Sequence, residues 1–258
     1  MKVVCCAGQK QNGKDTIADY LLPYMKSWYP KTDTGEDEVW ERGAFANAVK
    51  RIFCDAFGVD FDFIEEWKQK DEAPPGFDMN VRKSLQFIGD GFREIRGNIW
   101  IELAFRKQKV STILSDGRYV NELKMTNYLG GLNLLTYRTG WLNNDKNESE
   151  AQMRPLVQWF DSTGMEGYIW DKLLDADGNP KDGWTVIAGS QGNFHYKEIP
   201  ENAMLVDLFI RNNGGVQDVC DKVHEFVLPY CVSQKWPVTE GGIDGEVFYP
   251  HNTNGYSA

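Results

Sequence analysis

A glycine-rich segment near the start of the chain constrains the fold more than any other feature. Residues 8–15 read Gly-Gln-Lys-Gln-Asn-Gly-Lys-Asp, between a short apolar run over 2–6 and a helical pattern over 16–25. Strand, glycine loop and helix in this order are typical of a phosphate-binding loop, or P-loop. Backbone N–H groups of such a loop point at phosphate oxygens, the helix N-terminus adds positive potential, and a lysine such as Lys14 reaches the β- and γ-phosphates. The segment predicts a nucleoside triphosphate site; the alternative is a glycine turn that only connects a strand to a helix.

The residue after the loop lysine departs from the usual P-loop pattern. Most P-loops have Ser or Thr at this position, and its hydroxyl binds Mg²⁺. Here the position is Asp15, and the first hydroxyl belongs to Thr16. The sequence therefore leaves open whether a metal ion is ligated directly.

Short apolar or β-branched runs recur along the chain and predict five strands. They lie at residues 2–6, 39–42, 110–114, 132–137 and 204–210. The segments between them carry apolar residues at helical spacing, most clearly over 44–57 and 81–92. Strands that alternate with helices form parallel sheets covered on both faces, and a chain of 258 residues can bury a large core. We expect an α/β fold with a five-stranded parallel sheet flanked by helices.

Two regions depart from this alternation. Residues 175–183 have turn chemistry and are flanked by aromatic residues, so we expect an insertion at about 151–200 that forms a hairpin-bearing cap. We expect its aromatic side chains to pack in a core, as aromatic side chains most often do. The segment 236–258 has little periodicity and is expected to be an extended or partly disordered tail. The domain itself is expected to span residues 1–235.

The charge and the cysteine content argue against several classes of protein. A net charge of −10 disfavours a surface that coats nucleic acid, because such surfaces carry excess Lys and Arg. The five cysteines include no C-x-x-C pair and are odd in number, so neither a zinc site nor a disulfide framework is indicated. No stretch approaches the roughly 18 apolar residues of a membrane span, and the first apolar run is too short for a signal peptide. We therefore expect a soluble, cytoplasmic protein.

A second charged group follows the predicted strand over 110–114. Asp116 lies at the carboxyl end of this strand, where ligands of open α/β sheets bind, and is a candidate for holding Mg²⁺ through water. Arg118 follows two residues later, and Glu122 begins the next predicted helix. A solvated, charged turn is the alternative interpretation.

Basic residues occur singly at the ends of other predicted elements. They are Lys50, Arg82, Arg93 and Arg138. Phosphoryl transfer depends on positioning two anions and neutralising the charge that develops, so cations that converge in the fold would suit it. Each of them alone is more often a surface charge.

Taken in order, these pieces resemble phage-type deoxynucleoside monophosphate kinases. The resemblance covers about residues 1–150 and 203–228, and the segment 151–200 is its main departure. The matching pieces are Gly-x-x-x-x-Gly-Lys-Asp-Thr at 8–16, Phe45-Ala46 with Lys50 and Phe57-Gly58, Leu85-Gln86-x-x-Gly89 with Arg93 and Trp100, Ser115-Asp116-x-Arg118-x-x-Asn121-Glu122, and Asn212-Asn213-Gly214.

The resemblance implies an adenylate-kinase-like P-loop kinase fold with a lid-side insertion. It also implies ATP with Mg²⁺ as the phosphoryl donor and a deoxynucleoside monophosphate as the acceptor. The implied catalytic residues are Lys14, Asp116, Arg118 and Arg138. The implied ATP-binding residues are Gly8, Lys10, Asn12, Gly13, Lys14, Asp15, Thr16 and Asn212. The implied acceptor-binding residues are Lys50, Arg82, Arg93 and Glu122, and the implied metal-binding residues are Thr16 and Asp116.

Two of these positions have a more specific place in the family pattern. Arg138 would begin the lid, where Glu148-Ser149-Glu150 is similar to a degraded His-x-Ser-Glu pattern with Asn147 in place of the histidine. Asn212 would lie near the adenine of ATP.

Two other functions stay open at this point. One is a P-loop kinase for another small phosphate or hydroxyl acceptor, and the other is a nucleotide-binding module without turnover. We expect no nucleic-acid or membrane partner, a homodimer as one option for assembly, and the host cytoplasm as the location if the gene is phage-encoded.

The resemblance yields a prediction for Arg93. A guanidinium group binds phosphate oxygens through paired hydrogen bonds, and the family pattern places this one on the monophosphate side. We expect Arg93→Ala to raise the KM for the acceptor more than the KM for ATP in steady-state kinetics. A rise in the KM for ATP alone would assign Arg93 to the other substrate.

Overall fold

The computed structural model describes residues 2–28, 35, 38–106, 110–140, 148–163, 184–186, 193–195 and 201–228. The chain divides into two compact units. The P-loop unit comprises Met1–Gly43 and Val110–Thr239, and the helical unit comprises Ala44–Lys109 and Glu240–Ala258. No helix among the described residues is long and apolar enough to cross a membrane.

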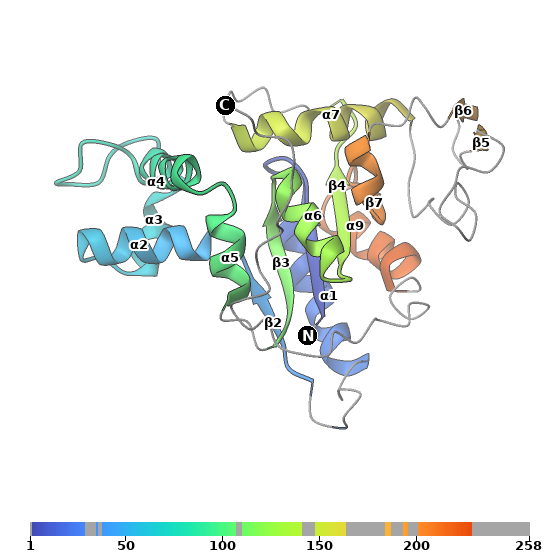
Figure 1. Ribbon diagram of the computed structural model, residues 1–258, viewed down its shortest axis with the longest axis horizontal. Coiled ribbons are helices and arrows are strands. Elements are labelled where there is room, and N and C mark those ends of the chain that lie inside the picture. The colour runs from blue at the N-terminus through green and yellow to red at the C-terminus, as the bar shows by residue number, and fades with distance from the viewer. Residues whose placement is uncertain are drawn as a thin grey trace. The chain divides into compact units, whose positions relative to one another are not determined.

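The P-loop unit is built on a five-stranded sheet in the order β2-β3-β1-β4-β7 (Figure 1). All neighbouring strands are parallel, which confirms the predicted α/β class and its five-stranded parallel sheet. The strands are β1 (Val3–Ala7), β2 (Trp40–Gly43), β3 (Ser111–Gly117), β4 (Leu132–Tyr137) and β7 (Leu208–Arg211).

Two strands differ from the predicted boundaries. β3 continues to Gly117, which pairs with Ala7 of β1 beyond an irregularity in the register that follows the Cys5–Leu114 pair. The last strand begins only at Leu208, since Glu201–Leu205 forms a 3₁₀ helix before it.

The strand order creates a switch point beside β1. The chain passes from β1 to β2 and β3 on one side, and β4 and β7 lie on the other side. In open α/β sheets, ligands bind where the strand order reverses, outside the carboxyl ends of the strands. The loop that follows β1 is therefore in the position where this fold class binds ligands.

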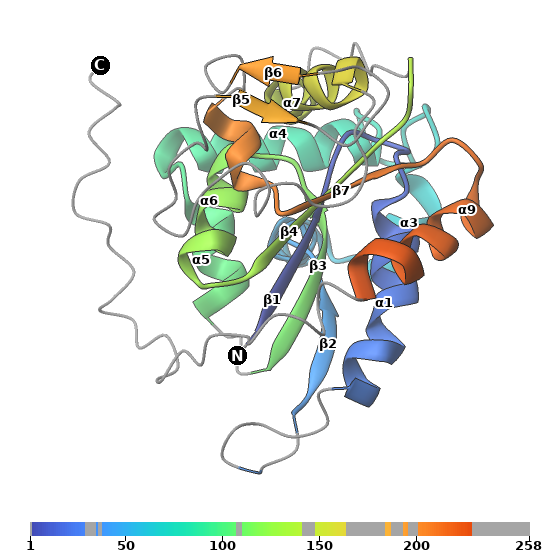
Figure 2. The same ribbon diagram turned by 90° about the vertical axis from the view of Figure 1, so that its right-hand side faces the viewer.

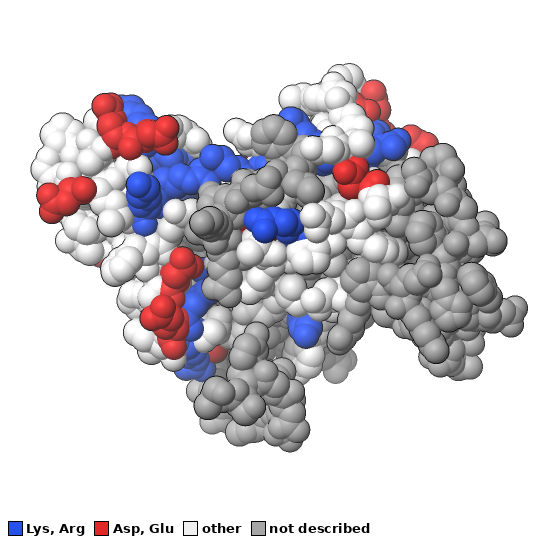
Figure 3. All heavy atoms as spheres, turned by 90° about the horizontal axis from the view of Figure 1, so that it is seen from above, with Lys and Arg blue, Asp and Glu red and all other residues white. Residues whose placement is uncertain are grey.

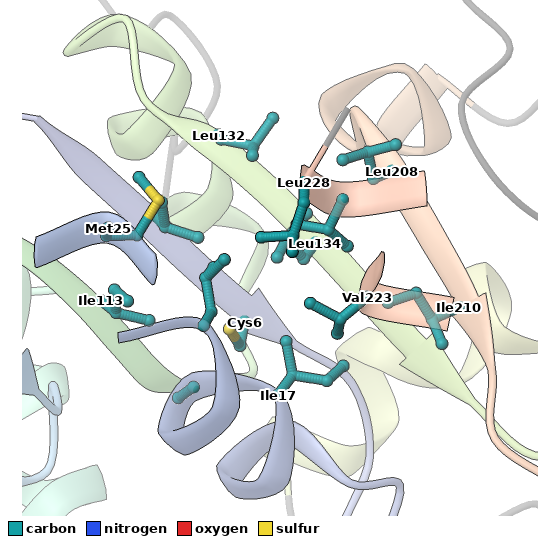
Figure 4. Packing of buried hydrophobic residues seen from close by; sticks show 14 of the residues in the cluster. Cys6, Ile17, Met25, Ile113, Leu132, Leu134, Leu208, Ile210, Val223 and Leu228 are labelled. Carbon is teal, nitrogen blue, oxygen red and sulfur yellow. The ribbon is translucent and has the colours of Figure 1, made fainter. Parts of the chain in front are cut away.

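Helices cover both faces of this sheet (Figure 2). On one face, α1 (Lys14–Trp28), α9 (Val216–Lys222) and the π-helical η4 (Val223–Val227) pack over β1, β4 and β7. α1 contributes Ile17, Leu21 and Met25, which recur every four residues and so share one side of the helix (Figure 4). Fully burying each such side chain contributes roughly 1.5–3 kcal/mol. The opposite face is covered by α6 (Val120–Tyr128), where the Thr126 side chain meets Cys5.

Helix α7 (Glu148–Thr163) belongs to this packed unit. Met153, Leu156, Val157 and Phe160 are fully buried or nearly so, and the Phe160 ring lies 4.5 Å from the Phe209 ring between centroids. Residues 151–163, expected to begin a separate insertion, therefore pack into the core of the P-loop unit.

The region after α7 contains two short antiparallel strands, β5 (Trp184–Val186) and β6 (Asn193–His195). Both strands follow the turn-rich residues 175–183, around which the hairpin was expected, so that hairpin stays a prediction. The turn-rich residues 175–183 and the tail 236–258 lie outside the described residues.

The helical unit consists, in its described part, of α2 (Asn47–Phe57), α3 (Phe61–Trp67), α4 (Val81–Ile95) and α5 (Ile99–Arg106). Helices expected over 44–57 and 81–92 are thus confirmed, with shifted ends. Phe53, Ile64 and Val81 are its fully buried centre. Asn80 caps α4 by accepting the Lys83 N–H at 2.9 Å, which satisfies an otherwise unpaired donor.

The packing of α7 can be tested by truncating one side chain. Phe160→Ala should lower the free energy of unfolding by about 3–5 kcal/mol, because it leaves a cavity against Phe209. Gln158→Ala, an exposed position on the same helix, should change it by no more than about 0.5 kcal/mol. Urea denaturation of both variants measures the difference. Equal stabilities would contradict a core role for α7.

Candidate functional site

The loop after β1 contains two glycines whose backbone conformation requires glycine. Gly8 and Gly13 have φ values of +138° and +100°, which side-chain-bearing residues rarely adopt. A Cβ on Gly13 would lie 2.6 Å from the Asn212 Nδ2, and one on Gly8 would overlap the Thr136 carbonyl oxygen. Glycine is therefore required at both positions for steric reasons as well as for its φ angle.

Side-chain hydrogen bonds join the loop to β4 and to the residue that follows β7. The Asn12 side chain donates to the Thr136 carbonyl at 3.2 Å, and the Thr136 hydroxyl donates to the Asn12 carbonyl at 2.7 Å. Asn212, directly after β7, donates to the same Asn12 carbonyl at 3.0 Å. All three residues are buried. Asn212, which the resemblance places near the adenine, thus supports the loop backbone in this structure, and the Asn12 side chain lies beneath the loop.

Lys14 begins α1 and folds back over the loop. Its Nζ donates to the Gln9 carbonyl at 2.6 Å, and the residue is only 5% exposed. The pKa of Lys14 is lowered to about 7, mainly by burial and then by the Arg118 guanidinium, while the carboxylates of Glu150, Asp15 and Asp116 partly oppose this shift. Among the described residues, the Lys14 amine donates to a neutral carbonyl and forms no ion pair, so an arriving anion would stabilise its charged form.

Glu150, from α7, joins the loop to Arg118. Its Oε2 accepts the Lys10 N–H at 3.1 Å, and its Oε1 accepts from the Arg118 Nη1 at 2.5 Å. Gln9 donates through its side chain to the Glu150 carbonyl at 3.3 Å. The resemblance places Glu150 in the lid pattern but assigns it no role in the site, and its contact with Lys10, 140 positions earlier, shows that it lies at the loop.

Arg42, at the end of β2, is a second site residue that the sequence did not indicate. Its guanidinium forms ion pairs with Asp15 and Asp19 on α1 and donates to the Ser115 hydroxyl at 3.2 Å. The Asp15 side chain is 76% exposed in this pair. Exposed ion pairs contribute about 0–1 kcal/mol, so Asp15 can exchange Arg42 for another cation at little cost.

The end of β3 brings three predicted residues to the same edge of the sheet. Asp116 and Arg118 are partly exposed there. Glu122 is instead buried at 3% exposure, and its Oε2 accepts the backbone N–H groups of Arg118 at 2.7 Å and of Tyr119 at 3.0 Å. The predicted acceptor-binding role of Glu122 is not what this geometry favours, because its carboxylate caps α6 and shapes the Arg118 turn.

Arg138 directly follows β4, the strand beside the P-loop strand. It is partly buried, and its Nε atom makes no hydrogen bond with any residue that the structure describes. One donor of this guanidinium group is thus held inside the protein at the same edge of the sheet as the loop.

The remaining predicted cations lie in the helical unit. Lys50 on α2 pairs with Glu65 at 2.9 Å, and Arg93 on α4 pairs with Asp90 at 3.3 Å. Arg82 lies in the first turn of α4 and is partly exposed. Figure 3 shows Lys and Arg side chains gathered over the part of this unit that carries α4, beside Asp and Glu side chains.

The oxygen donors near the loop suit a magnesium–nucleotide complex. Within the described part of the chain, no group of three His, Cys, Asp or Glu side chains could hold a metal ion by itself. Mg²⁺ bound with a nucleotide usually takes one or two protein oxygens and completes its shell with phosphates and water. The Thr16 hydroxyl and the Asp116 carboxylate are hard oxygen donors of this kind, and both are partly exposed.

Comparison with solved structures gave 16 matching chains. A solved structure described as shikimate kinase from Acinetobacter baumannii in complex with shikimate aligns with a TM-score of 0.40 and 13% identity, over 89% of this chain and 94% of that one. No family model and no curated protein sequence matches the chain.

The buried Lys14 predicts a pH-dependent stability. Its pKa is about 7 in the folded protein against an ordinary 10.5, so between these values the unfolded chain binds more protons and the free energy of unfolding rises with pH. Lys14→Met removes this titration. We expect it to be more stable than wild type at pH 7, and the advantage should shrink by on the order of 2 kcal/mol between about pH 7.5 and about pH 9.5. Urea denaturation across this range measures it; a constant difference would mean that Lys14 stays charged.

Proposed function

We propose that this chain is a P-loop kinase that transfers the γ-phosphoryl group of ATP to a deoxynucleoside monophosphate, giving ADP and a deoxynucleoside diphosphate. The observation that carries the proposal is the glycine loop after β1, which hydrogen bonds hold in place, with Lys14 at its end and Arg118 beside it. Such a loop supplies backbone donors and cations for a polyphosphate. The ordered resemblance of the sequence to phage-type deoxynucleoside monophosphate kinases supports the choice of acceptor.

On the ATP side, Lys14 would exchange the Gln9 carbonyl for phosphate oxygens. That carbonyl is a neutral acceptor, whereas a phosphate is an anion that favours the ammonium form. A hydrogen bond from the Lys14 amine to the phosphate would therefore favour the protonated, positively charged form of the amine, which burial disfavours. The positive end of α1, which starts at this residue, adds to the attraction.

The Thr16 hydroxyl and the Asp116 carboxylate would hold Mg²⁺. When bound there, the ion would reduce the negative charge of the phosphate oxygens. Asp15 stands where most P-loops have the hydroxyl ligand, and in this chain its partner is Arg42. Asp15 would then either stay paired with Arg42, away from the ion, or exchange Arg42 for the ion.

The transfer step itself requires little covalent chemistry from the protein. A monophosphate acceptor is already ionised near neutral pH, so no general base is needed. The work of the site is to align donor and acceptor and to neutralise developing charge, which we assign to Lys14, Arg118 and Arg138. Lys50, Arg82 and Arg93 are proposed to bind the acceptor, since the family pattern places acceptor residues in these segments.

The deciding experiment measures ATP consumption and product formation with each deoxynucleoside monophosphate in turn, with Mg²⁺ present. Stimulation by one or more of these acceptors, with the corresponding diphosphate formed, supports the proposal. Turnover only with another acceptor would establish a different P-loop kinase. Nucleotide binding without any turnover would indicate a binding module.

Lys14→Ala tests whether the loop lysine drives the reaction. We expect phosphoryl transfer to fall by at least ~100-fold, because the ammonium neutralises charge that builds on the bridging oxygens. Circular dichroism and the unfolding midpoint serve as controls for folding. Near-normal turnover in a folded Lys14→Ala protein would rule out the P-loop mechanism.

A further inference from the structure

Glu150 takes up groups that a phosphate-binding loop normally offers to its ligand. Its two carboxylate oxygens accept from the Lys10 backbone N–H at 3.1 Å and from the Arg118 guanidinium at 2.5 Å. Its side chain is 1% exposed, so these bonds are shielded from water. A carboxylate and a phosphate both accept charge-assisted hydrogen bonds from such donors, and one N–H group cannot bind both well.

We propose that Glu150 is an internal anion that holds the place of a phosphate group in the ligand-free protein and releases Lys10 and Arg118 when the nucleotide binds. The inference rests on the proposed function, because it assumes that the loop binds phosphate. It adds a role for a residue of α7 that competes with the substrate for the loop.

The surrounding contacts indicate that the side chain moves and the helix stays. The Glu150 carbonyl accepts from the Gln9 side chain at 3.3 Å, and Gln152 accepts the Val120 backbone N–H at 3.2 Å. Three residues beyond Glu150, Met153 is fully buried. These contacts anchor α7 at Glu150 and just beyond it, whereas rotation about the side-chain bonds of Glu150 would free both donors.

This competition lowers the apparent affinity for nucleotide. Only the fraction of molecules in which Glu150 has released the loop is competent to bind, and the measured dissociation constant rises in inverse proportion to that fraction. Glu150→Gln keeps the size of the side chain and removes its charge. A hydrogen bond to a charged group contributes about 1.5–3 kcal/mol, so the variant should bind nucleotide roughly tenfold more tightly or better.

The experiment is calorimetric titration with a non-hydrolysable ATP analogue and, separately, with inorganic tripolyphosphate, each with Mg²⁺. The chains compared are wild type, Glu150→Gln, Arg118→Ala and the double variant. Glu225→Gln is the matched control, because it removes one exposed negative charge from the same unit away from the loop. We expect at least about tenfold tighter binding for Glu150→Gln, little change for Glu225→Gln, and loss of most of the gain in the Arg118→Ala background.

Three results would overturn the proposal. Unchanged or weaker binding by Glu150→Gln would mean that Glu150 supports the loop, and the proposed function would stand. A gain that persists without Arg118 would show general charge repulsion and no competition for that residue. Absence of binding by every chain would remove the proposed function together with this inference.

A wild-type measurement covers the case in which Glu150→Gln fails to fold. Nuclear magnetic resonance can follow the Glu150 side-chain carboxyl carbon and the Lys10 amide as the ATP analogue is added. Displacement requires both signals to shift on saturation. An unshifted carboxyl signal in the bound protein would overturn the proposal.

Discussion

The bonds to the Asn12 carbonyl are the constraint on which the candidate site depends. This carbonyl is buried within a loop that has left the β-sheet, so its polar oxygen requires donors from elsewhere. The Thr136 hydroxyl and the Asn212 amide supply them from two different strands. Leaving a buried acceptor unsatisfied lowers the stability of the fold by about 1–3 kcal/mol. The same hydrogen bonds fix the position of the loop relative to the sheet. Strand pairing and the shape of the loop are therefore coupled through one backbone atom.

The sequence predicted most of the sheet because strand formation here follows local pattern. Each of the five strands overlaps one of the predicted apolar or β-branched runs, and Asp116 and Arg118 could be placed at a sheet edge from strand position alone. Residues that act through distant contacts could not be found in this way. Arg42 looks like an ordinary charged residue until folding brings it to Asp15, and the lid pattern that includes Glu150 does not reveal its contact with Lys10. Glu122 illustrates the converse, since a charged residue that the sequence places near a site is here a buried helix cap.

Helix α7 escaped prediction for a related reason. Its apolar residues recur at helical spacing, but Pro155 interrupts the run. The turn-rich residues 175–183 suggested an insertion, and its predicted start at about residue 151 lies within α7. The packing of Phe160 on Phe209 places α7 in the core, and this tertiary contact is not visible in the local sequence pattern. One helix thus contributes to the core at its far end and to the loop at its near end.

The environment of Lys14 also gives the loop an unusual chemical property. An amine acts as a nucleophile only in its neutral form, and exposed lysines with a pKa near 10.4 are almost entirely protonated at neutral pH. With a pKa of about 7, a large share of Lys14 side chains carries a free electron pair at that pH. The desolvation that prepares this lysine for an anion therefore also makes it an electron-pair donor under conditions in which ordinary surface lysines are inert.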